Sequence, residues 1–126
     1  MNKYGFIFEQ LNTVLGIPYE YWEWTSNDIP GRYWVGECTD IPTNTEDGYR
    51  ESTMLLTGTT RGKAIVLETD KQAIENHFPV AGGLRAAIDG GAIAVFFAGA
   101  TPVPTGEADL KRIQINLDIK EWKGMK

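Results

Sequence analysis

The first segment of the chain carries the clearest helical pattern. Its apolar side chains recur at steps of three and four residues, the spacing that places them along one stripe of an α-helix. They are Tyr4, Ile7, Phe8, Leu11, Val14 and Leu15. Asn2 is a suitable N-cap, and Gly16 followed by Pro18 ends the pattern. The segment therefore predicts an amphipathic helix with one packed face and one solvated face.

The last segment carries an equally clear strand pattern. Apolar residues alternate with polar residues at every second position, so one face of the strand is apolar and the other is polar. The apolar positions are Ile113, Ile115, Leu117 and Ile119. This segment predicts a half-buried β-strand.

Strands are also predicted in the first half of the chain, over residues 19–24, 33–39 and 49–59, which are rich in aromatic and β-branched side chains. Asp40–Gly48 holds turn residues and no apolar period, so it predicts a long polar loop between two strands. Residues 92–98 are almost continuously apolar and predict a buried strand.

Two helices are predicted in the centre of the chain. Helical spacing favours one over residues 69–78, with Thr69 or Asp70 as its cap and a proline directly after it. The second is short, over residues 83–89, and a glycine pair ends it. Residues 99–109 contain two prolines and predict a loop.

The order of these elements predicts a single α+β domain over residues 1–126. The length suits one domain, and a hydrophobic content of 42% is ordinary for a globular protein. We expect a mixed, mostly antiparallel sheet, with the N-terminal helix and the central helix pair packed on one face.

Catalytic and metal-binding chemistry is sparse in this sequence. The single Cys38 excludes an internal disulfide and a cysteine-based zinc site, and the single His77 excludes a multi-histidine metal centre. Gly58–Ala64 departs from a phosphate-binding loop, because three residues rather than four separate its glycines and Ala64 replaces the required hydroxyl. We therefore expect no cofactor, no enzymatic activity, an inert thiol, and a histidine that contacts the last carbonyls of its helix.

Charge and hydropathy indicate which partners and which cellular location the protein is expected to have. The net charge of −5 argues against tight binding to nucleic acid, which needs clustered basic residues. No apolar run is long enough to span a bilayer, and the first residues lack the pattern of a signal peptide. We expect a protein that is made and kept in the cytoplasm.

An aromatic cluster is the unusual feature of the sequence. Six aromatic residues fall within sixteen positions. They are Tyr19, Tyr21, Trp22, Trp24, Tyr33 and Trp34. Because neighbours on a strand point to opposite faces, these side chains cannot all enter one small core. Some of them are expected at the surface, where they would be exposed or covered by another chain.

The order of segments resembles the tail-terminator, or tail-completion, proteins of long-tailed bacteriophages, the type called minor tail protein U in lambda-like phages. The likeness lies in the opening helix followed by Ile17-Pro18-Tyr19, the acidic loop at Asp40–Gly48, the central helix pair, and Ala108-Asp109-Leu110 before the final alternating strand. It covers nearly the whole chain and includes no catalytic motif.

The resemblance implies a structural protein of the virion tail that is assembled in the host cytoplasm. Members of the family form a ring, commonly hexameric, that caps the tail tube at its final length and provides the surface to which the head docks. The implied partners are further copies of the chain, the major tail tube protein and a head-completion or connector protein, with no membrane. DNA passes through the ring without being specifically bound, and an acidic protein suits such a passage because like charges repel.

A ring protein is expected to use interface residues rather than catalytic ones. A head-to-tail contact between copies would cover exposed aromatic side chains. The candidate anchors and cross-subunit charges are Tyr21, Trp22, Trp24, Trp34, Glu46, Asp47, Arg50 and Arg61.

Two other functions stay open on the sequence alone. An aromatic-rich module that binds carbohydrate or protein would use Trp22, Trp24 and Trp34 as stacking surfaces. A small hydrolase would use Glu37 or Asp40, although no second group with an assigned role accompanies either of them.

Overall fold

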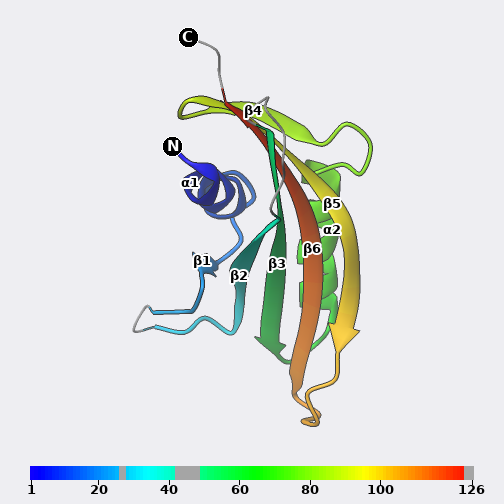
Figure 1. The fold of residues 1–126 in the computed structure, drawn as a ribbon. Coiled ribbons are helices and arrows are strands. Elements are labelled where there is room, and N and C mark those ends of the chain that lie inside the picture. Colours follow the sequence, from blue (N-terminus) through cyan, green and yellow to red (C-terminus); the bar gives the residue numbers. More distant parts are fainter. Residues whose placement is uncertain (26–27, 42–48, 124–126) are drawn as a thin grey trace.

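The computed structural model describes residues 1–25, 28–41 and 49–123. They form an α+β fold in which a curled, mixed sheet of six strands is covered by helices (Figure 1). The helical segments are α1 (Lys3–Phe8), the π-helix η1 (Glu9–Val14) and α2 (Ile65–His77). The strands are β1 (Tyr19–Tyr21), β2 (Arg32–Ile41), β3 (Tyr49–Arg61), β4 (Leu84–Ile88), β5 (Gly91–Val103) and β6 (Leu110–Lys123). The sheet order is β1-β2-β3-β6-β5-β4, with β1 parallel to β2 and the other neighbours antiparallel.

The N-terminal helix forms where the sequence predicts it. The side chain of Asn2 caps α1 by accepting a hydrogen bond of 3.0 Å from the backbone N–H of Gly5. The helix continues into η1, where the N–H of Leu15 donates to the carbonyl of Gln10. Gly16 then adopts a φ of 68° and ends the helix. The predicted amphipathic helix and its N-cap are confirmed.

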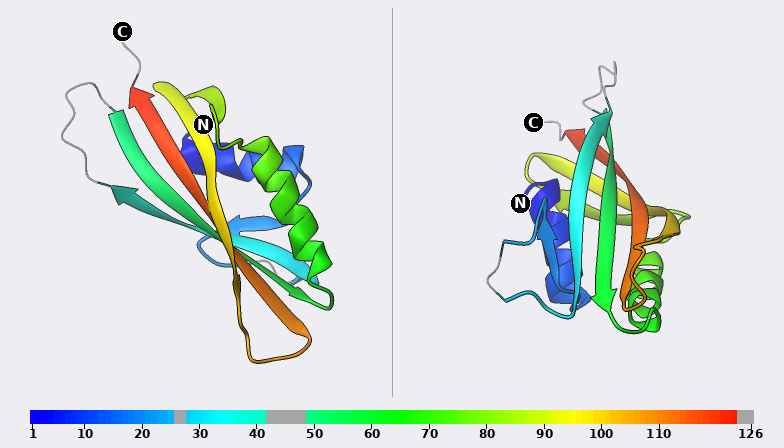
Figure 2. Two further views of the ribbon diagram at one scale, coloured as in Figure 1. Left: turned by 90° about the vertical axis from the view of Figure 1, so that its right-hand side faces the viewer. Right: turned by 90° about the horizontal axis from the view of Figure 1, so that it is seen from below.

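The core lies on one face of the sheet. Cross-strand partners share a face, and the row Trp34, Gly58 and Ile113 marks the buried one. The predicted alternation of the last strand is confirmed, because its four apolar residues are buried while Asn116 and Asp118 between them are exposed. Residues from α1, η1 and α2 complete the same cluster, and the left view of Figure 2 shows both helices on one side of the sheet.

Helix α2 begins four residues before the predicted start at Thr69. Neither predicted cap residue is a cap. The Thr69 hydroxyl donates to the carbonyl of Ile65 one turn earlier, and Asp70 is buried inside the helix. The run before Thr69 is rich in β-branched residues and fits a strand equally well, so local preference does not fix its conformation. Packing of Leu67 and Ile74 into the core decides for helix, because these residues lie on one helical stripe.

The predicted second central helix is wrong, and so is the helix pair. Residues 84–88 form strand β4, which pairs antiparallel with β5 through a tight hairpin closed at Ile88 and Gly91. Gly83 and Gly90 have φ values of 65° and 76° and bend the chain before and after β4. The strand is favoured because β5 provides hydrogen-bonding partners along the whole segment. A helix of five residues would form few backbone hydrogen bonds of its own.

Two predicted loops are shorter than expected. Strand β5 continues to Val103 through Pro102, at a level where β4 no longer pairs with it and a proline is tolerated as on an edge strand. The predicted loop over 99–109 therefore starts only after Val103. Strand β2 extends through Asp40 and Ile41, which were expected in the polar loop, and the remainder of that loop lies outside the described residues.

Ion pairs hold the N-terminal segment against the β4–β5 turn and against strands β2 and β6. The backbone of Met1 accepts a hydrogen bond from the N–H of Asp89, in the β4–β5 turn, and its amino group pairs with the Asp89 carboxylate. Lys3 is buried, and its Nζ lies 2.6 Å from Asp40 Oδ1 and 3.4 Å from Glu121 Oε1. Burial alone would lower the pKa of Lys3, but the hydrogen bond that Lys3 donates to Asp40 and the nearby negative charges raise it above its ordinary range.

Candidate functional site

The edge of the sheet at β1 ends in an unusual backbone conformation. Trp22 has a φ of 77°, which is rare for a bulky residue and costs about 1–2 kcal/mol. Its N–H donates to the carbonyl of Gly36 at 2.7 Å, and the N–H of Glu23 donates to the carbonyl of Tyr21. The predicted strand over 19–24 is therefore wrong in its second half, because the left-handed residue turns the chain away from β2. The turn leaves the Trp22 side chain 73% exposed.

Tyr21 packs against the turn at Trp22 and joins it to neighbouring elements. Its side chain is half-buried, and its hydroxyl accepts a hydrogen bond of 3.2 Å from the N–H of Cys38. Its ring centroid lies 4.8 Å from that of Tyr4 and 6.4 Å from that of Trp22, in edge-to-face geometry with the latter. A shallow cavity of about 300 Å³ is lined by Tyr21, Trp22, Glu37 and Cys38. Trp22 is thus an exposed aromatic side chain that packs against the well-anchored ring of Tyr21.

Trp24 is held by its own local contacts. Its Nε1 donates to the carbonyl of Asp28 at 3.3 Å, and its ring packs 5.5 Å from the ring of Tyr33. The carboxylate of Glu20 accepts hydrogen bonds from the backbone and hydroxyl of Thr25. The aromatic residues after β1 are therefore positioned by contacts within the edge, and Trp24 is only half-buried.

Trp34, a predicted surface anchor, lies instead in the core. Its side chain is fully buried, and its Nε1 donates to Asp70 Oδ2 at 2.9 Å. The same carboxylate oxygen accepts from Arg32, so one buried acid joins α2 to β2. The register places Trp34 opposite Gly58, where a Cβ atom would meet the indole at 2.6 Å. Trp34 thus presents no surface to another chain or to a sugar.

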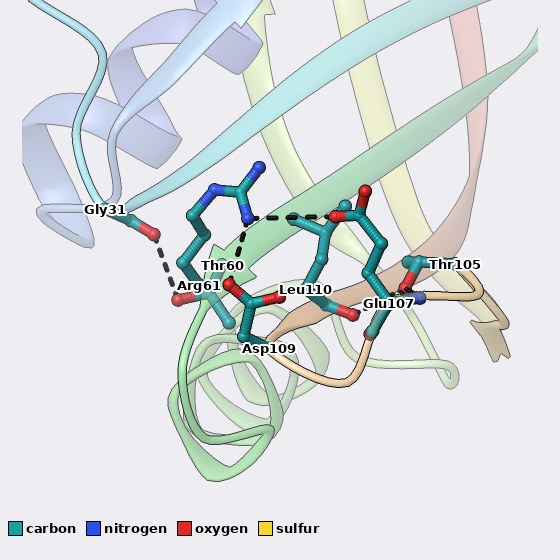
Figure 3. Close-up of polar contacts among 7 residues, drawn as sticks. All are labelled: Gly31, Thr60, Arg61, Thr105, Glu107, Asp109 and Leu110. Carbon is teal, nitrogen blue, oxygen red and sulfur yellow. Dashed lines mark hydrogen bonds and ion pairs between the residues drawn. The ribbon is translucent and has the colours of Figure 1, made fainter.

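Arg61, a predicted cross-subunit charge, has partners within its own chain (Figure 3). Its Nη1 lies 3.1 Å from Asp109 Oδ2 and 3.8 Å from Glu107 Oε2, and all three side chains are exposed. Nearby, the hydroxyl of Thr60 donates to the carbonyl of Gly31. These contacts tie together the chain segments at this end of β2, β3 and β6.

The remaining candidates are not brought together with the aromatic edge. Arg50 is exposed on β3, at the end of that strand opposite to Arg61. Glu46 and Asp47 lie outside the described residues. Of the two acids considered for a hydrolase, Asp40 pairs with Lys3, while Glu37 is exposed beside Trp22.

Within residues 1–25, 28–41 and 49–123, no set of three or more His, Cys, Asp and Glu side chains could hold a metal ion. His77 does not contact the last carbonyls of α2. Its Nε2 instead lies 2.7 Å from Gln10 Oε1, which joins α2 to η1, and burial lowers its pKa. No described helix is long and apolar enough to cross a membrane.

Sequence reasoning missed the two buried charges that position these elements, Lys3 and Asp70. Both carry a readable signal, because each lies on the apolar stripe of its helix. Lys3 shares a stripe with Ile7, and Asp70 lies between Leu67 and Ile74. A charge on a buried stripe indicates an ion pair with the element that the helix covers.

Comparison with known protein families, curated proteins and solved structures found no match to this chain. The function must therefore be argued from its own residues.

Proposed function

We propose that the chain is a structural protein of a phage or prophage tail, which forms a ring, commonly hexameric in proteins of this kind, and caps the tail tube. In this role it ends tube polymerisation and offers a docking surface to the head-completion or connector protein. Its partners are other copies of itself, the tube protein and the connector. It acts without catalysis or a cofactor, in the host cytoplasm during assembly and then in the virion tail.

The observation that carries the proposal is Trp22. A large aromatic side chain, 73% exposed and held in a left-handed backbone conformation, is costly to an isolated protein. Exposed aromatic residues of this kind are the usual anchors of protein interfaces. The net charge of −5 is compatible with a passage for DNA that does not bind it. The resemblance in element order supports the proposal less strongly at residues 83–89, because that segment is a strand.

The test is a tube-capping assay. Tail tube protein from the same phage is polymerised with and without this chain, and tube lengths are measured by negative-stain microscopy. We expect shorter tubes with a ring at one end, and rings of the chain alone at high concentration. A chain that remains monomeric in the presence of tubes and leaves their length unchanged would contradict the proposal.

A binding module for carbohydrate is the second candidate, favoured by the cavity of about 300 Å³ beside Trp22 and Glu37. An indole face next to a carboxylate can stack on a sugar and accept hydrogen bonds from its hydroxyls. Saturable quenching of tryptophan fluorescence by a sugar, lost in Trp22→Ala, would support it. No response across a glycan array would remove it.

A further inference from the structure

We propose that copies of this chain associate head to tail, with Trp22 of one copy entering a socket on the outer face of the β4–β5–β6 corner of the next. The socket is lined by Arg85, Ala86, Ala87, Ala92, Ile93 and Trp122, of which Arg85, Ala87, Ala92 and Trp122 lie on the outer face of the sheet. This inference deepens the proposed ring by naming the two surfaces that would form it.

The socket lies on the sheet face that points away from both helices. Ala87, Ala92 and Trp122 are consecutive cross-strand partners and therefore share a face. The neighbouring row of partners, Ala86, Ile93 and Glu121, faces the core side, where Glu121 meets Lys3. The helices cover that core side only, which leaves the socket open.

The shape of the socket suits a large flat side chain. Its cavity is about 390 Å³. The exposed side chains of Ala87 and Ala92 are small, so they fill little of the cavity. The half-buried ring of Trp122 forms one wall, and its centroid lies 5.6 Å from that of the Tyr49 ring. Arg85 stands at the rim with its Nε bound to the carbonyl of Gly82. A guanidinium held beside an aromatic wall can stack on an incoming indole.

Charge complementarity identifies the occupant as a second copy. Trp22 is accompanied by the exposed acids Glu23 and Glu37. The socket carries the exposed Arg85, and Lys120 lies on the same face because Arg85, Ala94 and Lys120 are consecutive cross-strand partners. Two acids near the socket already have partners: Asp89 in the hairpin turn pairs with the amino terminus, and Glu51 on the socket face accepts a hydrogen bond from the Tyr49 hydroxyl. An acidic rim around the indole thus meets a basic rim around the cavity, which favours this pairing over contact between two like edges.

The topology makes the contact heterologous. Trp22 follows β1 and the socket includes β4, the two opposite edges of the sheet order, and α1 lies between them (Figure 1). Each copy therefore offers one Trp22 and one socket at different places. Such contacts propagate from copy to copy, and they form a ring when the rotation closes.

The test uses two variants that each remove one half of the contact. Trp22→Gly removes the side chain and suits the φ of 77°, so the fold is kept. Ala87→Glu fills the socket and adds a repelling charge at an exposed position. The matched controls are Ile65→Ala, which removes another apolar side chain that is 64% exposed, and Ala108→Glu in an exposed loop. Circular dichroism confirms folding, and sedimentation velocity measures assembly.

We expect the wild type and both controls to self-associate, and each test variant alone to lose affinity by ~100-fold, as for an aromatic hot spot. A 1:1 mixture of the two variants should form a heterodimer and nothing larger, because one Trp22 and one intact socket remain. Assembly of either variant like the wild type would overturn the inference. So would a mixture that stays monomeric while the wild type assembles, or a wild type that stays monomeric at about 1 mM.

The outcome separates this inference from the proposed function. Rings that cap tubes but persist in both variants would leave the function standing and overturn the socket. Head-to-tail assembly that follows the two variants but leaves tube length unchanged would support the socket and contradict the tail function.

Discussion

Trp22 and Trp34 belong to neighbouring elements at the same edge of the sheet, yet one is 73% exposed and the other fully buried. A buried indole needs space for its ring and an acceptor for its N–H, and Trp34 has both. Gly58 on the adjacent strand leaves room for its ring, and Asp70 accepts its N–H. Trp22 follows a three-residue strand whose pairing has just ended, and its left-handed backbone turns the side chain outward. The neighbours of an aromatic residue, more than its type, therefore determine whether it lies in the core or at the surface.

The largest expected effect comes from truncating the two tryptophans in parallel. Trp34→Ala should lower the free energy of unfolding by about 3–5 kcal/mol, because it empties a buried site and leaves Asp70 without one donor. Trp22→Ala should change it by no more than about 0.5 kcal/mol, because the side chain is exposed in the monomer. Urea denaturation measures both. Equal losses would break the distinction.

The next effect comes from filling the space beneath Trp34. Gly58→Ala places a Cβ atom 2.6 Å from the indole, within a strand that cannot shift freely, and should cost about 2–3 kcal/mol. Gly31→Ala is the matched control, because nothing lies within 4 Å of the added atom. The control should be neutral or gain up to about 0.5 kcal/mol. A tolerated Gly58→Ala would show that Trp34 does not depend on the glycine.

The buried carboxylate gives a smaller effect. Asp70→Asn keeps an oxygen for the N–H of Trp34 but removes the charge that faces Arg32, and should cost about 1–2 kcal/mol. Glu68→Gln makes the same chemical change on the same helix, at an exposed pair with Lys71, and should cost about 0.5 kcal/mol or less. Thermal unfolding of the two variants compares them directly. If both lost the same amount, the Asp70 pair would be no more than a surface contact.

The smallest effect isolates the backbone of Trp22. Trp22→Gly should be more stable than Trp22→Ala by about 1 kcal/mol, because glycine adopts a φ of 77° without strain. The control pair is Gln72→Gly and Gln72→Ala at an exposed position inside α2, where glycine should be the less stable by about 1 kcal/mol. Chemical denaturation of the four variants measures the difference in the free energy of unfolding between the Gly and Ala variants, which should have opposite signs at the two positions. The same sign at both positions would mean that the Trp22 turn is not strained.

Much of the fold was predictable where a pattern repeats over many residues. The helix capped by Asn2 and the alternation through Ile113–Ile119 are both present. Prediction failed where two structures compete locally. Residues 83–89 contain no repeating pattern long enough to distinguish strand from helix, and pairing with β5 decided the matter. The predicted start of α2 was wrong for the same reason, because the run before Thr69 fits a strand and a helix equally well.

The candidate site was predictable only in part. The sequence correctly indicated that some aromatic residues of the cluster must leave the core, and Trp22 does so. It did not indicate which ones, and Trp34 was wrongly placed at the surface. That choice depends on Gly58, which lies far along the chain and meets Trp34 only through the β2–β3 register.

Composition and local patterns are sufficient to predict the periodic elements, the acidic balance, the scarcity of catalytic groups and the excess of aromatic side chains, because these properties depend only on residue content and on neighbours along the chain. The folded chain shows in addition which aromatic residues are buried, which charges are paired, and that an exposed indole and a shallow cavity lined by Arg85 lie at opposite edges of one sheet. These features arise from contacts between residues distant in the sequence, set by strand register and sheet order, which no local pattern encodes.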